Sequence, residues 1–202
     1  MLVCILIVSG CSNIRLQQEK SPQSVTALQV KLNPYKQSDF NQVEATFFTH
    51  QPKELVFRVL SDVKQTSQWL DRLESIEVLA VYSNHQYLLR SIIDSPWPFN
   101  DREIITCVNT DFNETITTIK IFSCSHRVPF NAKYLRLLQV ESSWTIKETS
   151  NSLVEVTYKN WIEPSGYVPA FIFNNELIDN TKFSLQKLQV IIENAVLDQY
   201  SY

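Results

Sequence analysis

Residues 152–196 read SLVEVTYKNWIEPSGYVPAFIFNNELIDNTKFSLQKLQVIIENAV and contain the two patterns that decide the fold. Up to residue 163 apolar residues such as Val154 and Val156 alternate with polar ones, which predicts a strand with one buried face. Beyond Pro169 apolar residues recur at a period near 3.6, which predicts a helix of about 25 residues over 170–196. The chain therefore ends in a half-buried strand, a short turn and one long amphipathic helix.

The preceding sequence predicts an antiparallel sheet and one short helix. Strand-like runs separated by short turns lie at 25–32, 42–49, 74–82, 86–93, 101–110, 115–123, 135–147 and 152–163. The short amphipathic helix is expected at 52–63. We therefore expect an α+β fold, in which a curved antiparallel sheet of seven to eight strands is covered by the long C-terminal helix. Such a layout leaves room for a hydrophobic tunnel between the sheet and the helix.

Composition excludes several classes of function. Of 202 residues only Gly10 and Gly166 are glycines, so neither a G-x-G-x-x-G turn nor a phosphate-binding loop can form. With 18 basic against 21 acidic residues there is no excess positive charge, and we expect no nucleic-acid partner. No C-x-x-C or H-E-x-x-H motif occurs, so we expect neither a metal site nor a cofactor.

The N-terminus has the pattern of an exported lipoprotein. Residues 1–8 form an apolar run too short to span a bilayer, and LIVSGC, ending at Cys11, is similar to a bacterial lipobox. We expect residues 1–10 to be a signal peptide cleaved before Cys11, which would carry the lipid anchor. The alternative is a buried strand, since no basic residue precedes Arg15.

A polar tether and a folded domain would follow the anchor. Residues 11–24 contain almost no apolar side chains and are expected to be flexible. Residues 25–202 form one domain, expected to be a monomer. Ser12 is not the aspartate that retains lipoproteins in the inner membrane, so we expect the periplasmic face of the outer membrane. A cytoplasmic or secreted protein is the alternative.

Two cysteines fall within the predicted sheet. Cys107 and Cys124 lie in runs joined by a turn near 111–114, and in a simple hairpin about that turn they would not face each other. We therefore expect two buried thiols rather than a disulfide.

Two longer motifs point to a known family. Residues 96–103 read PWPFNDRE and residues 166–174 read GYVPAFIFN. The first resembles the P-W-P-x-x-D-R-[DE] segment that opens a central strand in START domains, the steroidogenic acute regulatory-related lipid-transfer family. The second resembles the G-x-[IV]-P-x-x-x-x-N segment that leads into that family's C-terminal helix.

Two shorter matches extend the resemblance over residues 40–185. Residues 133–136 with Trp144 resemble the family's basic-aliphatic-Arg strand, and Asp62 with Trp69 resembles the pair after its short helix. The resemblance implies the helix-grip fold, a hydrophobic tunnel, and binding of one lipid or sterol-like molecule without chemistry. A tethered lipid binder that transfers or senses its ligand near a membrane is the function implied.

Seven residues are candidates for contact with the ligand. The aromatic candidates are expected to line the tunnel or to be plain core: Trp97, Phe99, Trp144, Tyr158 and Phe173. Arg136 is in phase with the apolar face of its strand, so it would meet a carboxylate or a ligand head group, or reach water at the strand end. Arg102 is expected either in a structural polar network or against the ligand.

The turn before the last helix is the expected gate. Gly166 can adopt backbone angles closed to other residues, and Pro169 stiffens the segment beside it.

Two other function classes remain open. Relatives with the same fold include polyketide cyclases, but His50, His85 and His126 fall at strand ends or in loops and have no evident acid partner. We therefore expect no enzymatic activity. A protein-interaction module with a filled core is the remaining alternative.

Overall fold

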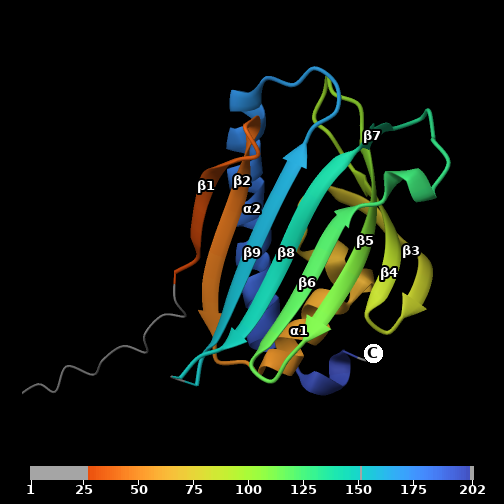
Figure 1. Ribbon diagram of the computed structural model, residues 1–202. Coiled ribbons are helices and arrows are strands. Elements are labelled where there is room, and N and C mark those ends of the chain that lie inside the picture. Colours follow the sequence, from red (N-terminus) through yellow and green to blue (C-terminus); the bar gives the residue numbers. More distant parts are fainter. Residues whose placement is uncertain (1–26, 151, 201–202) are drawn as a thin grey trace, which may run out of the picture.

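A computed structural model describes residues 27–150 and 152–200 as a curved sheet around one long helix (Figure 1). The predicted signal peptide, the Cys11 anchor and the whole tether lie outside these residues. The strands are β1 (Gln29–Tyr35), β2 (Ser38–Thr49), β3 (Leu73–Ser83), β4 (Gln86–Ile93), β5 (Arg102–Phe112), β6 (Ile116–Ser123), β7 (Leu135–Leu137), β8 (Gln139–Glu148) and β9 (Val154–Glu163). The α-helices are α1 (Lys53–Ser61) and α2 (Ala170–Asn194), with short 3-10 helices η1 (Val63–Gln68), η2 (Ser125–Arg127) and η3 (Leu197–Gln199).

The fold class predicted from the sequence is confirmed. Eight strands pair antiparallel in the order β1-β2-β9-β8-β6-β5-β4-β3, and the three-residue β7 pairs in parallel with β5. The expectation of a single strand at 135–147 is wrong, because Leu138 interrupts the strand and separates β7 from β8. The side chain of Leu138 is 61% exposed at this interruption.

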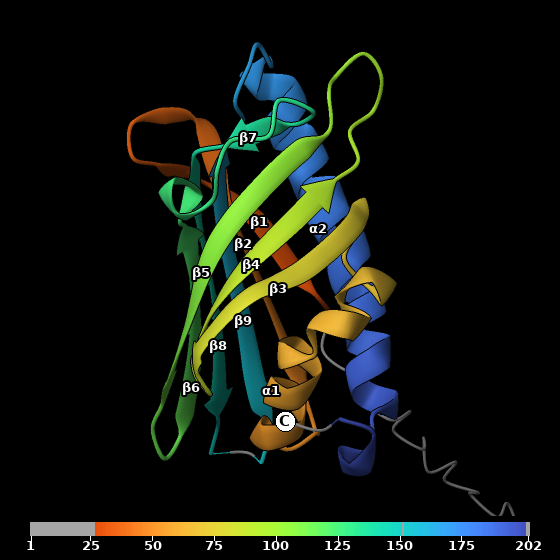
Figure 2. The ribbon, with the colours of Figure 1, turned by 90° about the vertical axis from the view of Figure 1, so that its right-hand side faces the viewer.

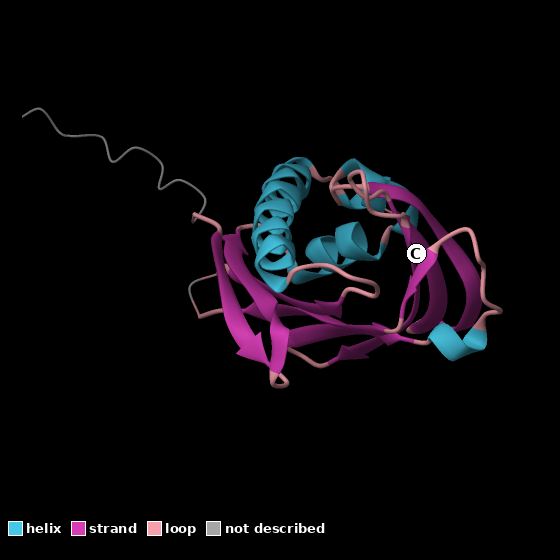
Figure 3. Cartoon of the chain, turned by 90° about the horizontal axis from the view of Figure 1, so that it is seen from above, coloured by secondary structure: helices cyan, strands magenta, loops and turns pink. Residues whose placement is uncertain are grey.

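Two helical segments close the open side of the sheet. α2 packs against β1 and β2 at one edge, and η1 packs against β3 at the other. Figure 2 shows α2 running along the sheet's open side, and Figure 3 shows the sheet curling around the helices. None of the helices in the described part of the chain is long and apolar enough to cross a membrane.

The main hydrophobic core lies between the C-terminal half of α2, α1 and the sheet. Leu185, Leu188 and Ile192 of α2 are almost fully buried against β2, β8, β9 and α1. Burying each such side chain contributes about 1.5–3 kcal/mol relative to leaving it in water. This end of the molecule is therefore filled, whereas the other end of α2 faces a cavity.

A smaller core lies on the convex face of the sheet and contains a disulfide between Cys107 and Cys124, with 5.6 Å between their Cα atoms. The expectation of two free thiols is wrong. The β5–β6 turn lies at 113–115, further along than expected, and pairs Cys107 with Phe122. Because Cys124 is two residues beyond Phe122, its side chain points to the same face as that of Cys107.

Candidate functional site: a cavity under the curved sheet

A cavity of about 400 Å³ lies between the concave face of the sheet and the N-terminal half of α2. Pockets for small molecules in proteins span roughly 300–1,000 Å³ and are mostly apolar. Most of the lining here is also apolar, with side chains from seven strands, β3 to β9; examples are Leu89, Ile104, Val108, Ile119, Ile121, Val140 and Ile162.

The first half of α2 forms the cavity's second wall. Phe173, Leu177, Thr181 and Ser184 recur at helical spacing and all line the cavity. Two hydrogen bonds at Asn174 fasten this part of the helix to β2: its Nδ2 donates to the Asp39 carbonyl at 3.0 Å, and its Oδ1 accepts from the Asn41 amide at 2.9 Å. The sheet and the helix are thus tied together at one end and packed at the other, with the cavity between.

All charged side chains that line the cavity gather at one corner, where β3 and β5 begin and β4 ends; they are Asp71, Arg72, Asp94, Arg102 and Glu176. Arg72 Nη2 forms an ion pair with Glu176 Oε2 at 3.0 Å. Arg102 Nη1 donates to the Asn100 carbonyl at 2.7 Å. Partial burial lowers the pKa of Arg102, and the neighbouring Asp101 carboxylate opposes that shift.

A group of uncharged polar side chains lies on β8 and β9. Ser142 Oγ donates to Asn160 Oδ1 at 2.6 Å, and Tyr158 lies on the same inner face. Burial raises the pKa of Tyr158, and the Ser142 hydroxyl partly offsets that rise. The Trp144 ring packs 4.3 Å from the ring of Tyr158, centroid to centroid.

Five of the seven residues predicted to contact the ligand line the cavity: Phe99, Arg102, Trp144, Tyr158 and Phe173. Trp97 does not line it, because its side chain is 92% exposed in the loop between β4 and β5. Ligand contact of the five remains a prediction.

Arg136 is also outside the cavity, and the parity argument that placed it there is wrong. Because Leu138 interrupts the strand, the alternation of inward-facing residues in β8 does not continue into β7. Leu137 rather than Arg136 therefore lines the cavity. Arg136 instead pairs with Glu103 of β5 across the convex face of the sheet.

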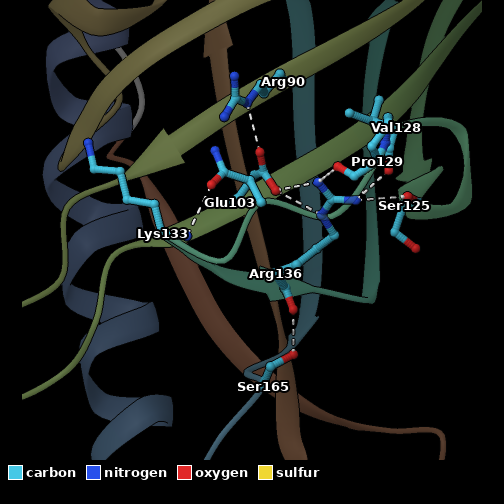
Figure 4. A network of polar contacts seen from close by, with 9 residues as sticks. Arg90, Glu103, Ser125, Val128, Pro129, Lys133, Arg136 and Ser165 are labelled. Atoms are coloured by element: carbon cyan, nitrogen blue, oxygen red, sulfur yellow. Dashed lines mark hydrogen bonds and ion pairs between the residues drawn. The ribbon is translucent and has the colours of Figure 1, made fainter.

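The Arg136 guanidinium is fully engaged there (Figure 4). Its Nε and Nη2 donate to Glu103 Oε2 at 2.8 and 2.5 Å. Its other hydrogens go to the carbonyls of Ser125, Val128 and Pro129. Arg90 Nε donates to Glu103 Oε1 at 2.7 Å from the other side. Arg136 therefore pairs with a carboxylate, one of the partners expected for it. It also holds the segment between β6 and β7 in place.

The expected gate borders the cavity. Gly166 has φ +82°, in the left-handed region that favours glycine, and Pro169 directly precedes α2. Ser165 Oγ donates to the Arg136 carbonyl at 2.9 Å, which ties the turn to β7. Pro164 and Val168, but not Gly166 or Pro169, contribute to the lining. Whether the turn opens stays a prediction.

Sequence reasoning missed Asn160 as a site residue. It has the same strand parity as Tyr158, so the alternation of residues 152–163 was a signal that could have found it. Ser142 likewise shares the parity of Trp144 but was not singled out.

Few side chains at this site suit catalysis or metal binding. None of the three histidines lines the cavity. Within residues 27–150 and 152–200, no group of three histidine, cysteine or acidic side chains could hold a metal ion.

Known structures resemble this architecture. A STAR-related lipid transfer protein from Xanthomonas axonopodis superposes with a TM-score of 0.73 at 17% identity, covering 82% of this chain and 93% of that one. Human StAR-related lipid transfer protein 5 superposes with a TM-score of 0.72 at 12% identity, covering 82% and 81%. The chain has the START fold. Superposition over most of both chains confirms the resemblance read from the sequence motifs.

Comparison of the sequence with known proteins gives weaker support for the START fold than the structures do. No family model matches the chain. An uncharacterised protein of Pseudomonas aeruginosa is 24% identical over 133 residues. The match covers 65% of this chain, and the chain spans 65% of the length of that relative.

Proposed function

We propose that this protein binds one lipid, or another hydrophobic small molecule, in the cavity under the sheet, and transfers or senses it near a membrane without altering it. The observation that carries the proposal is the apolar cavity of about 400 Å³ between the sheet and α2. Each ligand methylene withdrawn from water there contributes about 0.8 kcal/mol, so a single acyl chain supplies several kcal/mol after ordering costs.

The neighbours support a binding role. Both solved structures compared above are described as lipid transfer proteins. Here the cavity contains no histidine and its carboxylates sit at one corner, which favours binding over acid–base chemistry. We therefore propose that the protein is not an enzyme.

A position at a membrane surface is part of the proposal. Trp97 and Tyr167 are almost fully exposed, in two loops that also contribute residues to the cavity lining. Aromatic side chains of this kind are favoured at membrane interfaces. The Cys107–Cys124 disulfide supports an oxidising compartment, as expected for a lipoprotein facing the periplasm.

Native mass spectrometry of protein purified from its own host, followed by extraction, tests the proposal. We expect a co-purifying lipid, or uptake of fluorescent lipids by protein stripped of it. Apo-protein that takes up none of these lipids would overturn the proposal and favour an interaction module. The same spectra test acylation at Cys11.

A further inference from the structure

Polar side chains lie in the cavity at a place where the proposed function does not require them. Ser142 of β8 and Asn160 of β9 are directly paired across the two strands, and Tyr158 lies two residues before Asn160 on the same face. All three line the cavity. An acyl chain alone would be held better by apolar side chains here.

The side-chain amide of Asn160 lacks a partner for its hydrogens. Asn160 is 7% exposed, and its Oδ1 accepts a hydrogen bond from Ser142. In the described part of the chain no hydrogen bond from its Nδ2 atom is found, and this atom is not one of the fully buried polar atoms that lack a partner. Because Asn160 lines the cavity, we infer that these hydrogens are open to it and that a ligand oxygen can accept from them.

On β5, the charged lining residue stands far from the row that contains this group. Strand pairing places Val108, Ile121, Ser142 and Asn160 in one row across the sheet. Val108 is six residues along β5 from Arg102, the nearest charged lining residue on that strand, which corresponds to roughly 20 Å at about 3.4 Å per residue. An ionised head group in this row would lose its hydration without gaining a counter-ion from β5.

We propose that the cavity selects an uncharged hydrophobic ligand with one hydroxyl or carbonyl oxygen, which is bound by Asn160 Nδ2 and the Tyr158 hydroxyl. This inference rests on the proposed function and names its ligand class. A ligand hydroxyl accepts from Asn160 and donates to Tyr158, whereas a carbonyl accepts from both. Burial raises the pKa of Tyr158, so the phenol stays neutral and can donate or accept a hydrogen bond.

Displacement of N-phenylnaphthylamine, an uncharged fluorescent probe, tests the inference on the protein from residue 11 onward. Three competitors share one hydrocarbon chain: hexadecanol, hexadecanoate and hexadecane. We expect hexadecanol to compete about tenfold more strongly than hexadecane, as one or two buried hydrogen bonds allow. Hexadecanoate should be the weaker of the two polar competitors.

The variant Asn160→Leu keeps the side-chain size and removes both amide groups. It should reduce the preference for hexadecanol over hexadecane to about twofold while hexadecane binds at least as well as before. Ile162→Val is the matched control, because Ile162 is on the same strand and lines the cavity without a polar contact. If a thermal melt shows that Asn160→Leu does not fold, Tyr158→Phe provides the same comparison.

The outcomes separate the two claims. Failure of the probe to bind the unaltered protein would overturn the proposed function and the inference with it. If the probe binds, three results would each overturn the inference alone. They are equal competition by hexadecanol and hexadecane, strongest competition by hexadecanoate, and an unchanged preference in Asn160→Leu.

Discussion

Glu103 is the least exposed charged side chain in the described part of the chain, at 1%. Two arginines share its carboxylate, and one of them, Arg136, is itself only 6% exposed. A buried charge of this kind persists only when its partners are close and its remaining hydrogen bonds are made. The network therefore holds β4, β5 and β7 in one arrangement rather than adding much net stability.

Neutralising Glu103 should be strongly destabilising. We expect Glu103→Gln to lower the free energy of unfolding by about 3–5 kcal/mol, because it leaves Arg136 buried without a counter-charge. Urea denaturation measures this change. Asp111→Asn is the control, since its ion pair with Lys120 is exposed and should contribute no more than about 1 kcal/mol. Equal losses in the two variants would contradict the account of the network.

The turn before α2 depends on a backbone conformation that other residues avoid. Gly166 has φ +82°, and a Cβ atom there would lie 3.1 Å from Leu135 Cδ2. Any side chain at residue 166 would therefore crowd Leu135 and strain the backbone, and a β-branched one would do so most.

Gly166→Val should destabilise this arrangement and speed ligand release several-fold, because a β-branched residue is strained at positive φ. Stopped-flow dissociation of a bound fluorescent lipid measures the rate. Gly166→Asn is the control, since asparagine tolerates these angles and should leave the rate within about twofold. Identical ligand-release rates in the unaltered protein and both variants would show that this turn is not a gate.

The segment between β6 and β7 is held to the sheet at both ends. The Cys107–Cys124 disulfide fastens its start, and Arg136, which follows its end, binds three carbonyls in its first half. Since the disulfide joins residues 17 apart, closing that loop restricts the unfolded chain.

Replacing both cysteines with alanine should lower the free energy of unfolding by about 3 kcal/mol. Urea denaturation of the double variant, with and without reductant, measures the loss. The unaltered protein under reductant should match the double variant, and reductant should not affect the latter. Equal stability of the oxidised protein and the double variant would show that the bridge does not form.

The whole molecule combines a filled half with an open half. Leu188 and Ile192 pack one end of α2 into the core, whereas Phe173 and Leu177 face the cavity. The packed end supports the fold, so the cavity can stay open without loss of the structure around it. Filling the cavity should therefore affect ligand binding more than stability.

Ile121→Trp should block ligand binding, because Ile121 lines the cavity near its middle row and a larger ring would occupy the space. We expect at least a tenfold loss of probe affinity with a melting temperature changed by only a few degrees. Phe122→Trp, on the exposed face of the same strand, is the control and should bind normally. Full binding by Ile121→Trp would place the ligand elsewhere.

Local patterns were enough to predict the antiparallel sheet, the long helix and two cavity-facing aromatic residues, Trp144 and Tyr158, because alternation and helical periodicity are properties of neighbouring residues. Phe99 and Phe173 lie instead in the two motifs that resemble START domains. The placement of Arg136 could not be predicted, because the interruption at Leu138 changes which residues of β7 face inward. The pairing of the cysteines could not be predicted either, because the turn at 113–115 shifts the register of β5 and β6. The Asn160 amide without an acceptor is likewise visible only once β8, β9 and α2 enclose a common space, because burial and hydrogen bonding depend on contacts between residues distant in the chain.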